Sequence, residues 1–304
     1  MVTLGMIGLG RMGGNMARRL QNGGIKVIAF NRNAAVAQSI AAECGLVVAE
    51  SVEELVMQLP SPRMVWIMLP AGDVVEQHIA EIVPLLKRGD ILVDGGNSWF
   101  KDSMRRAESL RSTGIHYVDA GVSGGIWGLA NGYCVMAGGD ENAIAALTPV
   151  LQVLAPAADR GWLHTGLVGS GHFTKMVHNG IEYGMMQAFA EGFALMKARE
   201  DFDLDLGAVA ELWRHSSVVR SWLLDLCADF LQKDQQLDSI APFVSDSGEG
   251  RWTALEAIEK GIPAPVMSLA LMMRFASQGK ADFGDKMLAK MREGFGGHAI
   301  TPKE

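Results

Sequence analysis

Short apolar runs alternate with stretches of helical spacing through the first 170 residues of the chain. The apolar runs lie at residues 3–7, 27–30, 64–69, 91–94, 117–119, 133–137 and 162–165. The helical stretches between them include residues 13–22, 34–43, 74–86 and 103–113. Strands that alternate with helices predict a parallel sheet that is covered on both faces. The runs are continuously apolar, which also fits strands buried on both sides.

Strand signals end near residue 171, and only helical patterns follow. These later segments are rich in Ala, Leu, Met, Glu and Lys, which are good helix formers. The expected helices lie at residues 173–199, 206–215, 221–232, 252–260, 265–277 and 283–292. The pattern therefore predicts an α/β chain. A doubly wound parallel sheet (residues 1–170) is followed by an all-helical domain (residues 171–304).

Composition and charge exclude several classes of protein. The chain has 304 residues, with 27 Lys or Arg against 34 Asp or Glu and a net charge of −7. An acidic chain lacks the basic footprint that nucleic-acid binding requires. Apolar stretches such as Met64–Ala71 are far shorter than the roughly 20 residues of a membrane helix. No charged-then-apolar leader precedes the first strand. We therefore expect no nucleic-acid partner and no membrane association.

The cysteines also restrict the possibilities. Cys44, Cys134 and Cys227 are widely spaced and form no CxxC pair. This arrangement predicts neither a disulfide framework nor a zinc site, and we expect no metal. We expect the three to be buried, unreactive thiols in a reducing cytoplasm.

A glycine-rich turn follows the first strand. Gly8, Leu9, Gly10, Arg11, Met12 and Gly13 fit the pattern GxGxxG, and a helical stretch follows directly. In a Rossmann-type fold the glycines allow a tight turn, a close backbone approach to a pyrophosphate and tight helix–strand packing. The helix N-terminus then offers free N–H groups to the anion. We predict a dinucleotide site here; the alternative is a glycine turn with packing duties only.

The end of the second strand indicates which dinucleotide binds. NAD sites usually carry an Asp or Glu there that holds the ribose hydroxyls. This chain has Asn31, Arg32 and Asn33 instead. The missing carboxylate removes a repulsion, and Arg32 can pair with a 2′-phosphate. We predict NADP, with NAD as the weaker alternative, and place Ala71 and Asn97 among the cofactor contacts.

A polar stripe runs along the longest expected helix. Lys175, His178, Asn179, Glu182 and Tyr183 share one helical face. Lys175 and Glu182 would be about 10.5 Å apart along the axis, so they could flank one small substrate. The alternative is an ordinary solvated face, but such faces are usually built from Glu and Lys alone. A neighbouring face carries Val177, Ile181, Met185 and Ala188 and is expected to be the packed side.

Two loops after strands would reach the same edge of the sheet. They are Asp94–Ser98, which contains Asn97, and Gly121–Gly125, which contains Ser123 and Gly124. Ligands bind at the carboxyl edge of such sheets. Together the loops indicate a pocket for a polyhydroxy compound, although each alone is more typical of a simple turn.

These motifs, in this order, resemble the 6-phosphogluconate dehydrogenase family, which is decarboxylating and belongs to the β-hydroxyacid dehydrogenase superfamily. The resemblance covers nearly the whole chain and looks like the short bacterial form. It rests on the phosphate loop Gly8–Asn15, the loops Gly95–Ser98 and Val122–Gly125, and the long segment Gly169–Gly184.

The resemblance implies oxidative decarboxylation of 6-phosphogluconate to ribulose 5-phosphate in the pentose phosphate pathway. Lys175 would be the general base at the substrate's 3-hydroxyl, and Glu182 would protonate C1 of the enediol left after loss of CO2. The other implied substrate contacts are Asn179, Asn97, Ser123, Gly124, Gly125, His178 and Tyr183. The last of these would touch the phosphate.

The C-terminal segment resembles the family as well. By that resemblance Arg292 would contact substrate phosphate and His298 the sugar acid, both from a neighbouring subunit. Arg274 is a third such contact by a weaker match. The implied assembly is a homodimer or homotetramer with exchanged C-terminal tails. On its own, a Gly-rich basic tail is more often frayed.

The chain departs from the family's longer enzymes at Trp99 and Trp127, which replace more polar residues, and above all at one loop. Ser247 and Glu249 stand where the longer enzymes have Lys and Thr beside the phosphate. A carboxylate there would repel a phosphate, so we expect this loop to differ in role or position. The main alternative function is dehydrogenation of another 3-hydroxy acid, but Glu182 argues against a simple dehydrogenase. Imine reductases depart at the lysine position, and a non-catalytic NADP-binding protein would not need Lys175, Asn179 and Glu182.

Overall fold

The computed structural model describes residues 2–296 and 299–301. The chain divides into two compact units, Met1–Val177 and His178–Glu304. The division falls inside the long helix α8 (Ser170–Lys197). The domain boundary expected between residues 170 and 171 stays a prediction. Among the described residues, no helix is both long enough and apolar enough to cross a membrane.

The first unit is built on one sheet, which has eight strands within the described residues, in the order β3-β2-β1-β4-β5-β6-β7-β8. The strands are β1 (Thr3–Ile7), β2 (Lys26–Phe30), β3 (Val47–Val48), β4 (Met64–Ile67), β5 (Ile91–Asp94), β6 (His116–Ser123), β7 (Cys134–Gly138) and β8 (Trp162–Gly166). The order reverses at β1, because β1 pairs with both β2 and β4. The expected doubly wound α/β fold is therefore confirmed.

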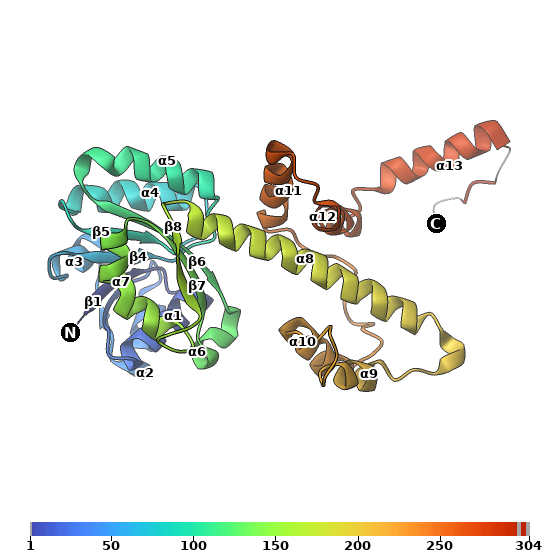
Figure 1. Cartoon of the computed structure of the whole chain (residues 1–304), viewed down its shortest axis with the longest axis horizontal. Coiled ribbons are helices and arrows are strands. Elements are labelled where there is room, and N and C mark those ends of the chain that lie inside the picture. Colours follow the sequence, from blue (N-terminus) through green and yellow to red (C-terminus); the bar gives the residue numbers. More distant parts are fainter. Residues whose placement is uncertain (1, 297–298, 302–304) are drawn as a thin grey trace. The chain divides into compact units, whose positions relative to one another are not determined.

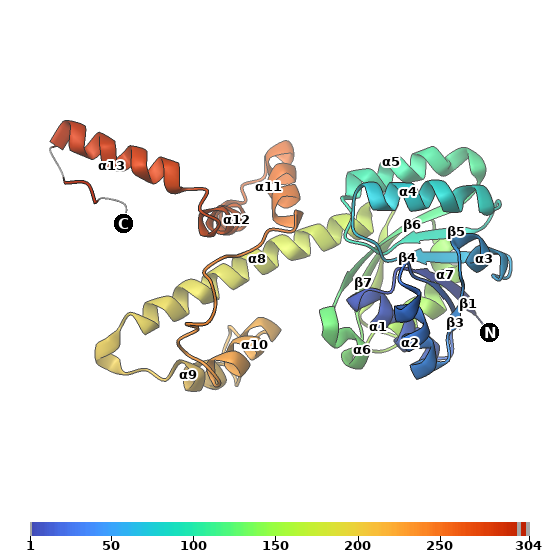
Figure 2. The same cartoon turned by 180° about the vertical axis from the view of Figure 1, so that it is seen from behind.

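Helices cover both faces of this sheet (Figures 1 and 2). They are α1 (Arg11–Asn22), α2 (Ala34–Cys44), α3 (Val52–Met57), α4 (Asp73–Ile82), α5 (Phe100–Leu110), α6 (Gly128–Asn131) and α7 (Glu141–Leu154), with short 3₁₀ turns η1 (Val83–Leu85), η2 (Arg111–Thr113) and η3 (Gly125–Trp127). Helices α1, α2 and α7 pack on one face, and α3, α4 and α5 on the other. Successive β2 residues join opposite clusters, Val27 one and Ile28 the other, which explains the continuously apolar strands.

The expectation of a fully parallel sheet is wrong at one strand pair. β6 and β7 are antiparallel, with Ser123 opposite Cys134, whereas the other pairings are parallel. A parallel return needs a crossover of a dozen or more residues. The connection between β6 and β7 holds only η3 and α6, which are too short for that path.

Several elements of the first unit, among them β3, α3 and α7, were not named in the sequence prediction. β3 has only two residues, too few for a recognisable apolar run. α3 is a six-residue helix whose N-terminus is capped by the Ser51 side chain, which accepts from the Glu54 amide. α7 contains Pro149, a residue that usually ends a helical pattern.

The side chain of Arg19 ties α1 to segments much later in the chain. Its Nε donates to the carbonyl oxygens of Val153 and Leu154 at 2.8 and 3.0 Å, and its Nη2 to that of Ala155 at 2.6 Å. Nη1 donates to the Leu129 carbonyl at 3.1 Å. One guanidinium therefore satisfies carbonyl groups at the ends of both α6 and α7, groups that helix termini otherwise leave unpaired.

The second unit contains helices and loops, and no strand among its described residues. It contains most of α8, then η4 (Glu200–Phe202), α9 (Leu206–Trp213), α10 (Trp222–Leu231), α11 (Glu249–Lys260), α12 (Pro265–Ser277) and α13 (Asp282–Gly296). Its buried residues form two small clusters, one around Phe193 and Leu224 and one around Tyr183 and Leu271. Many large apolar side chains stay exposed, and Val218 is fully so.

Candidate active site

The glycine loop after β1 has the geometry of a phosphate cradle. Gly8 has a φ of +93°, and a Cβ there would lie 2.4 Å from the Met68 carbonyl oxygen. A Cβ at Gly13 would lie 2.1 Å from the Gly8 carbonyl oxygen, so the first turn of α1 packs directly on the loop. Around Gly10 no described atom lies within 4 Å of a Cβ position, and the backbone stays open to a ligand.

Of the three residues after β2, Asn31 and Asn33 make hydrogen bonds within the protein, whereas Arg32 points to solvent. Asn31 Oδ1 accepts from the Leu9 amide at 2.9 Å and thereby ties β2 to the glycine loop. Asn33 caps α2 through its side chain, which accepts from the Ala35 amide. Arg32 is exposed and makes no hydrogen bond or ion pair with any other described residue. Of these three side chains, only that of Arg32 is left for a ligand anion.

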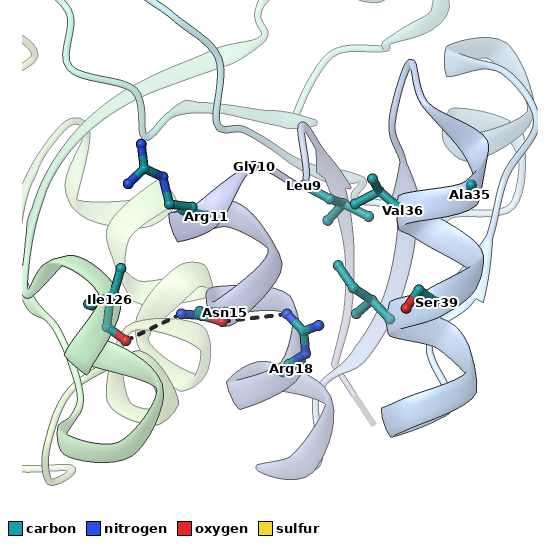
Figure 3. Close-up of a pocket in the computed structure, with 10 residues that line it drawn as sticks. Leu9, Gly10, Arg11, Asn15, Arg18, Ala35, Val36, Ser39 and Ile126 are labelled. Carbon is teal, nitrogen blue, oxygen red and sulfur yellow. Dashed lines mark hydrogen bonds between the residues drawn. The ribbon is translucent and has the colours of Figure 1, made fainter.

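A hollow of about 550 Å³ opens beside the glycine loop (Figure 3). Its lining comes from Leu9, Gly10, Arg11, Asn15, Arg18, Ala35, Val36, Ser39, Ile40 and Ile126. Arg18 is neutralised here by a bidentate pair with Glu43, which raises the pKa of Arg18 and lowers that of Glu43. Arg11 is exposed and has no hydrogen-bond or ion-pair partner in the described part of the chain, so its charge is available at this hollow.

A buried carboxylate shapes the loop that presents Asn97. Asp94, the last residue of β5, accepts from Ser98 Oγ at 2.7 Å and from Arg106 Nη1 at 2.9 Å. It also accepts from the Gly96 amide at 3.1 Å. These bonds close the turn and leave Asn97 exposed at its tip. Asp94 and Arg106 were not predicted as site residues, although Asp94 belongs to the loop that the sequence singled out.

Lys175, on α8, packs against the carboxyl-terminal half of β6. A Cβ at Gly121 would lie 2.3 Å from Lys175 Cβ, so helix and strand are in direct contact at this point. Ser123 and Gly124 follow two and three residues later, and Gly124 has a φ of +136°. The first unit therefore brings the predicted lysine, Ser123 and Gly124 to one edge of its sheet.

The cysteine expectation needs correction at this edge. Cys134, opposite Ser123, is exposed, while Cys44 and Cys227 are half-buried. The expected burial of all three thiols was therefore wrong. Desolvation still raises the pKa of Cys134, against the opposing charge of Lys175. Its thiol consequently stays protonated near neutral pH, and a protonated thiol is a poor nucleophile.

The start of α8 is held by a second buried carboxylate. Asp119 of β6 accepts from the amides of Gly169 and His172 at 2.6 and 2.7 Å. Burial raises the pKa of Asp119, with His172 and the two amides acting in the opposite direction. The His172 ring is also buried, and its Nδ1 lies 2.7 Å from Ser103 Oγ on α5. These contacts fix the helix turn directly before Lys175.

Further along α8 the buried and exposed faces are the reverse of the expected ones. Asn179 and Tyr183 of the polar stripe are buried, whereas Ile181 and Met185 of the apolar face are exposed. His178 and Glu182 are about 40% exposed at the side chain, with His178 Nδ1 3.8 Å from Glu182 Oε2. Two of the five residues of the polar stripe, Asn179 and Tyr183, are therefore packed against protein, which the alternative of a solvated face does not explain.

Partners for this buried stripe come from the loop that departs from the family pattern. Asn179 Nδ2 donates to Glu249 Oε1 at 2.8 Å, and Tyr183 Oη lies 3.3 Å from Ser247 Oγ. The guanidinium of Arg274 stacks on the Tyr183 ring, 3.4 Å from its centroid. Glu249 and Ser247 were noticed in the sequence only as departures. Nothing in the sequence indicated that Glu249 would meet Asn179.

The remaining predicted residues lie apart from these contacts. Ala71 is exposed in the loop after β4. Arg292 is exposed on α13 and makes no hydrogen bond or ion pair with the described residues. His298 lies outside the described residues. Within residues 2–296 and 299–301, no cluster of three or more His, Cys, Asp or Glu is arranged to hold a metal ion.

Comparison with known proteins adds to this geometry. Residues 3–166 match the family model described as the NAD binding domain of 6-phosphogluconate dehydrogenase, and residues 171–296 match that of the C-terminal domain. The NAD(+)-dependent, decarboxylating 6-phosphogluconate dehydrogenase of Haloferax volcanii is 41% identical over all 304 residues and is itself covered completely. The decarboxylating enzyme of Aggregatibacter actinomycetemcomitans is 37% identical over 90% of this chain and 59% of its own length.

A solved structure shows the same fold. It is a 6-phosphogluconate dehydrogenase of Plasmodium falciparum, described with its cofactor NADP+ and its substrate 6-phosphogluconate. The similarity has a TM-score of 0.85 at 32% identity and covers 99% of this chain and 67% of that one. The names of these relatives thus include both nicotinamide cofactors.

Proposed function

The chain belongs to the 6-phosphogluconate dehydrogenase family of decarboxylating oxidoreductases, and we propose that it converts 6-phosphogluconate and NADP+ to ribulose 5-phosphate, CO2 and NADPH. The observation that carries the proposal is the set Lys175, Asn179 and Glu182 on one helix. Lys175 contacts the strand that ends in Ser123, and Asn179 is buried with a carboxylate partner. A merely nucleotide-binding protein has no use for this combination.

The described residues suit NADP. The open backbone at Gly10 and the N-terminus of α1 suit a pyrophosphate. Arg32 is the side chain after β2 that is left for a 2′-phosphate, and no carboxylate stands there to repel it. NAD remains the alternative cofactor, because a relative with 41% identity carries NAD(+) in its name.

In the proposed reaction, Lys175 and Glu182 act at different steps. The bound nicotinamide supplies the acceptor for the hydride from C3 of the sugar acid. Lys175 takes the proton of the 3-hydroxyl as general base. The resulting ketone lies β to the carboxylate and accepts the electron pair that CO2 leaves behind. The lysine ammonium polarises that ketone oxygen. Glu182 then donates a proton to C1 of the five-carbon enediol, which gives the ketose.

Another 3-hydroxy acid is the second candidate substrate, and the loop at Ser247 favours it. The longer enzymes have Lys and Thr where this chain has Ser247 and Glu249, so a phosphate would find fewer cations and an added carboxylate. Against this, Arg274 and Tyr183 are already stacked together. In our proposal this pair and Arg292 bind the substrate phosphate.

The initial rate of NADPH formation tests the proposal. We expect turnover with 6-phosphogluconate and little with unphosphorylated gluconate, since the phosphate contributes binding energy that gluconate lacks. An active enzyme that prefers gluconate would overturn the phosphate site at Arg274. Complete inactivity with 6-phosphogluconate would overturn the substrate assignment and move the search to other 3-hydroxy acids.

We also propose that the helical unit pairs with a second copy of the chain, as a homodimer or homotetramer. Its two buried clusters are small, while Val218, Ile258 and Phe283 are 100%, 77% and 76% exposed. Large exposed apolar surfaces usually mark association sites. The proposed sharing of the site through His298 can be tested by mixing inactive Lys175→Ala chains with inactive chains truncated before His298. Recovered activity is expected; none in verified mixed oligomers would contradict it.

A further inference from the structure

A line of hydrogen bonds in the second unit ends on the ring of His178. Glu249 Oε1 accepts from Asn179 Nδ2 at 2.8 Å, and Asn179 Oδ1 lies 3.0 Å from His178 Nδ1. Glu182 Oε2 lies 3.8 Å from the same ring nitrogen. Glu249 and Asn179 are only 5% and 9% exposed. The inner end of the line is therefore shielded from water, and its outer end, the imidazole, is half-exposed.

Close helix packing places Glu249 at Asn179. A Cβ at Gly180 would lie 2.7 Å from the Thr253 methyl group, and a Cβ at Gly250 would lie 2.6 Å from the Tyr183 ring. Glycines at both positions let α8 and α11 approach to a distance that other residues would prevent. Glu249 is also the first residue of the twelve-residue helix α11. Acidic side chains are favoured in the first turn of a helix.

The chemistry of these groups fixes the direction of each bond. Glu249 Oε1 accepts the hydrogen bond at Asn179, so it selects the amide nitrogen of that side chain. The amide oxygen must then face His178, and an oxygen requires a donor. Both acceptors near Nδ1, from Asn179 and Glu182, therefore call for a proton on that nitrogen. We propose that Glu249 is a positioning residue that, through Asn179, holds neutral His178 in the tautomer with the proton on Nδ1.

The consequence concerns the other ring nitrogen. In this tautomer Nε2 carries a lone pair, so it accepts a hydrogen bond from a hydroxyl group and cannot donate one to a carboxylate. This role rests on the proposed function, in which the substrate is a polyhydroxy acid. The proposed role of Glu249 therefore differs from that of the Thr in the longer enzymes, which lies beside the phosphate. It selects for a substrate hydroxyl at His178 instead of contacting phosphate.

The test is Glu249→Gln, read by two independent measurements. Glutamine keeps the shape but can donate as well as accept, so Asn179 can turn its amide and release the tautomer. Nitrogen-15 NMR of histidine-labelled protein at alkaline pH reports which ring nitrogen carries the proton. The His178 signal is identified by its loss in His178→Gln. Glu259→Gln, on the exposed side of α11, is the matched control.

We expect wild type and Glu259→Gln to show the Nδ1–H form. Glu249→Gln should show a large share of the Nε2–H form and about a tenfold lower kcat, as expected for the loss of a charge-assisted hydrogen bond. The KM for the cofactor should not change. An Nε2–H tautomer in the wild type would overturn the proposal without any variant. An altered tautomer with unchanged kcat, a lower kcat with an unchanged tautomer, or neither change, would also overturn it.

The NMR measurement needs no substrate. A wild type that is inactive on 6-phosphogluconate would therefore refute the proposed function, while the tautomer would still decide whether Glu249 positions His178.

Discussion

Gly121 of β6 lies directly against the side chain of Lys175 on α8. A Cβ at Gly121 would come within 2.3 Å of Lys175 Cβ and 2.9 Å of the Gly171 carbonyl oxygen. Both distances are too short for real atoms, so the lysine keeps its place only while the strand beneath it has no side chain. The position of the proposed base is thus set by a residue that has no chemistry of its own.

We therefore expect Gly121→Ala to lower kcat by about 100-fold, since a shift of about 1 Å in a reacting group can cost that much. Cofactor affinity should change little, because the glycine loop lies after a different strand. Gly192→Ala is the control, since no described atom lies within 4 Å of a Cβ there. Steady-state kinetics with 6-phosphogluconate and NADP+ as the varied substrates measure kcat and the KM for the cofactor. A kcat within twofold of wild type would show that the lysine tolerates displacement.

Substitutions of Lys175 and Glu182 should block different steps of the reaction. Lys175→Ala should abolish NADPH formation, because no base remains to take the hydroxyl proton. Glu182→Gln should form NADPH in the first turnover and then slow the release of ribulose 5-phosphate by about 100-fold, a typical effect of removing a general acid. Rapid-quench measurement of both products separates the steps. Glu191→Gln, exposed on the same helix, is the control. Full turnover by Glu182→Gln would remove its acid role.

Arg32 should decide the choice of cofactor. Its guanidinium has no hydrogen-bond or ion-pair partner among the described residues, so its loss should cost no structure. Arg32→Ala should raise the KM for NADP+ by tenfold or more, the value of a charge-assisted hydrogen bond, and leave that for NAD+ nearly unchanged. Arg111→Ala, which removes another exposed arginine, is the control. An unchanged ratio of kcat/KM for the two cofactors would refute the assignment.

Asp119 should make stability depend on pH. Its two oxygens accept from two amides, and an Asn can satisfy only one of them, so Asp119→Asn should lower the free energy of unfolding by about 2 kcal/mol at neutral pH. Burial raises the pKa of Asp119. The folded state therefore holds its proton more tightly than the unfolded chain does.

The pH-dependent part of the contribution of Asp119 to the free energy of unfolding is consequently fully present below about pH 4 and is lost as the pH rises through the raised pKa. Asp119→Asn should lack this slope. Urea titrations of both proteins between pH 4 and pH 7 measure the difference, with the exposed Asp238→Asn as control. Parallel stability curves for wild type and Asp119→Asn would contradict the raised pKa.

Local pattern predicted most of the fold because strands and helices here carry clear apolar periodicities. The exceptions have local causes. Val47–Val48 is too short to show a period, Pro149 interrupts the signal of α7, and the direction of β7 depends on the length of its connection. Apolar spacing reveals an element only where the element is long and uninterrupted, and it does not give the direction of a strand. These three features therefore could not be predicted from it.

The candidate site was predictable only where its residues are close in sequence. Lys175, Asn179 and Glu182 share a helical spacing, so the stripe was visible. Glu249 lies 70 residues from Asn179, and no period connects them. The packed side of α8 was also misjudged. An apolar stripe normally marks the buried face, but here Tyr183 and Asn179 are buried by α11 and α12, and Ile181 is left exposed.

The bonds of Arg19 have a consequence for the order in which the protein folds. The strand β1 and the glycine loop are synthesised before α7, yet the guanidinium of Arg19 donates to carbonyl groups at residues 153–155, more than 130 positions later. Contacts of such sequence separation are slow to form. During synthesis, α1 therefore lacks these contacts until α7 has left the ribosome. Truncation before residue 153 should leave α1 without the hydrogen bonds from Arg19 to α7.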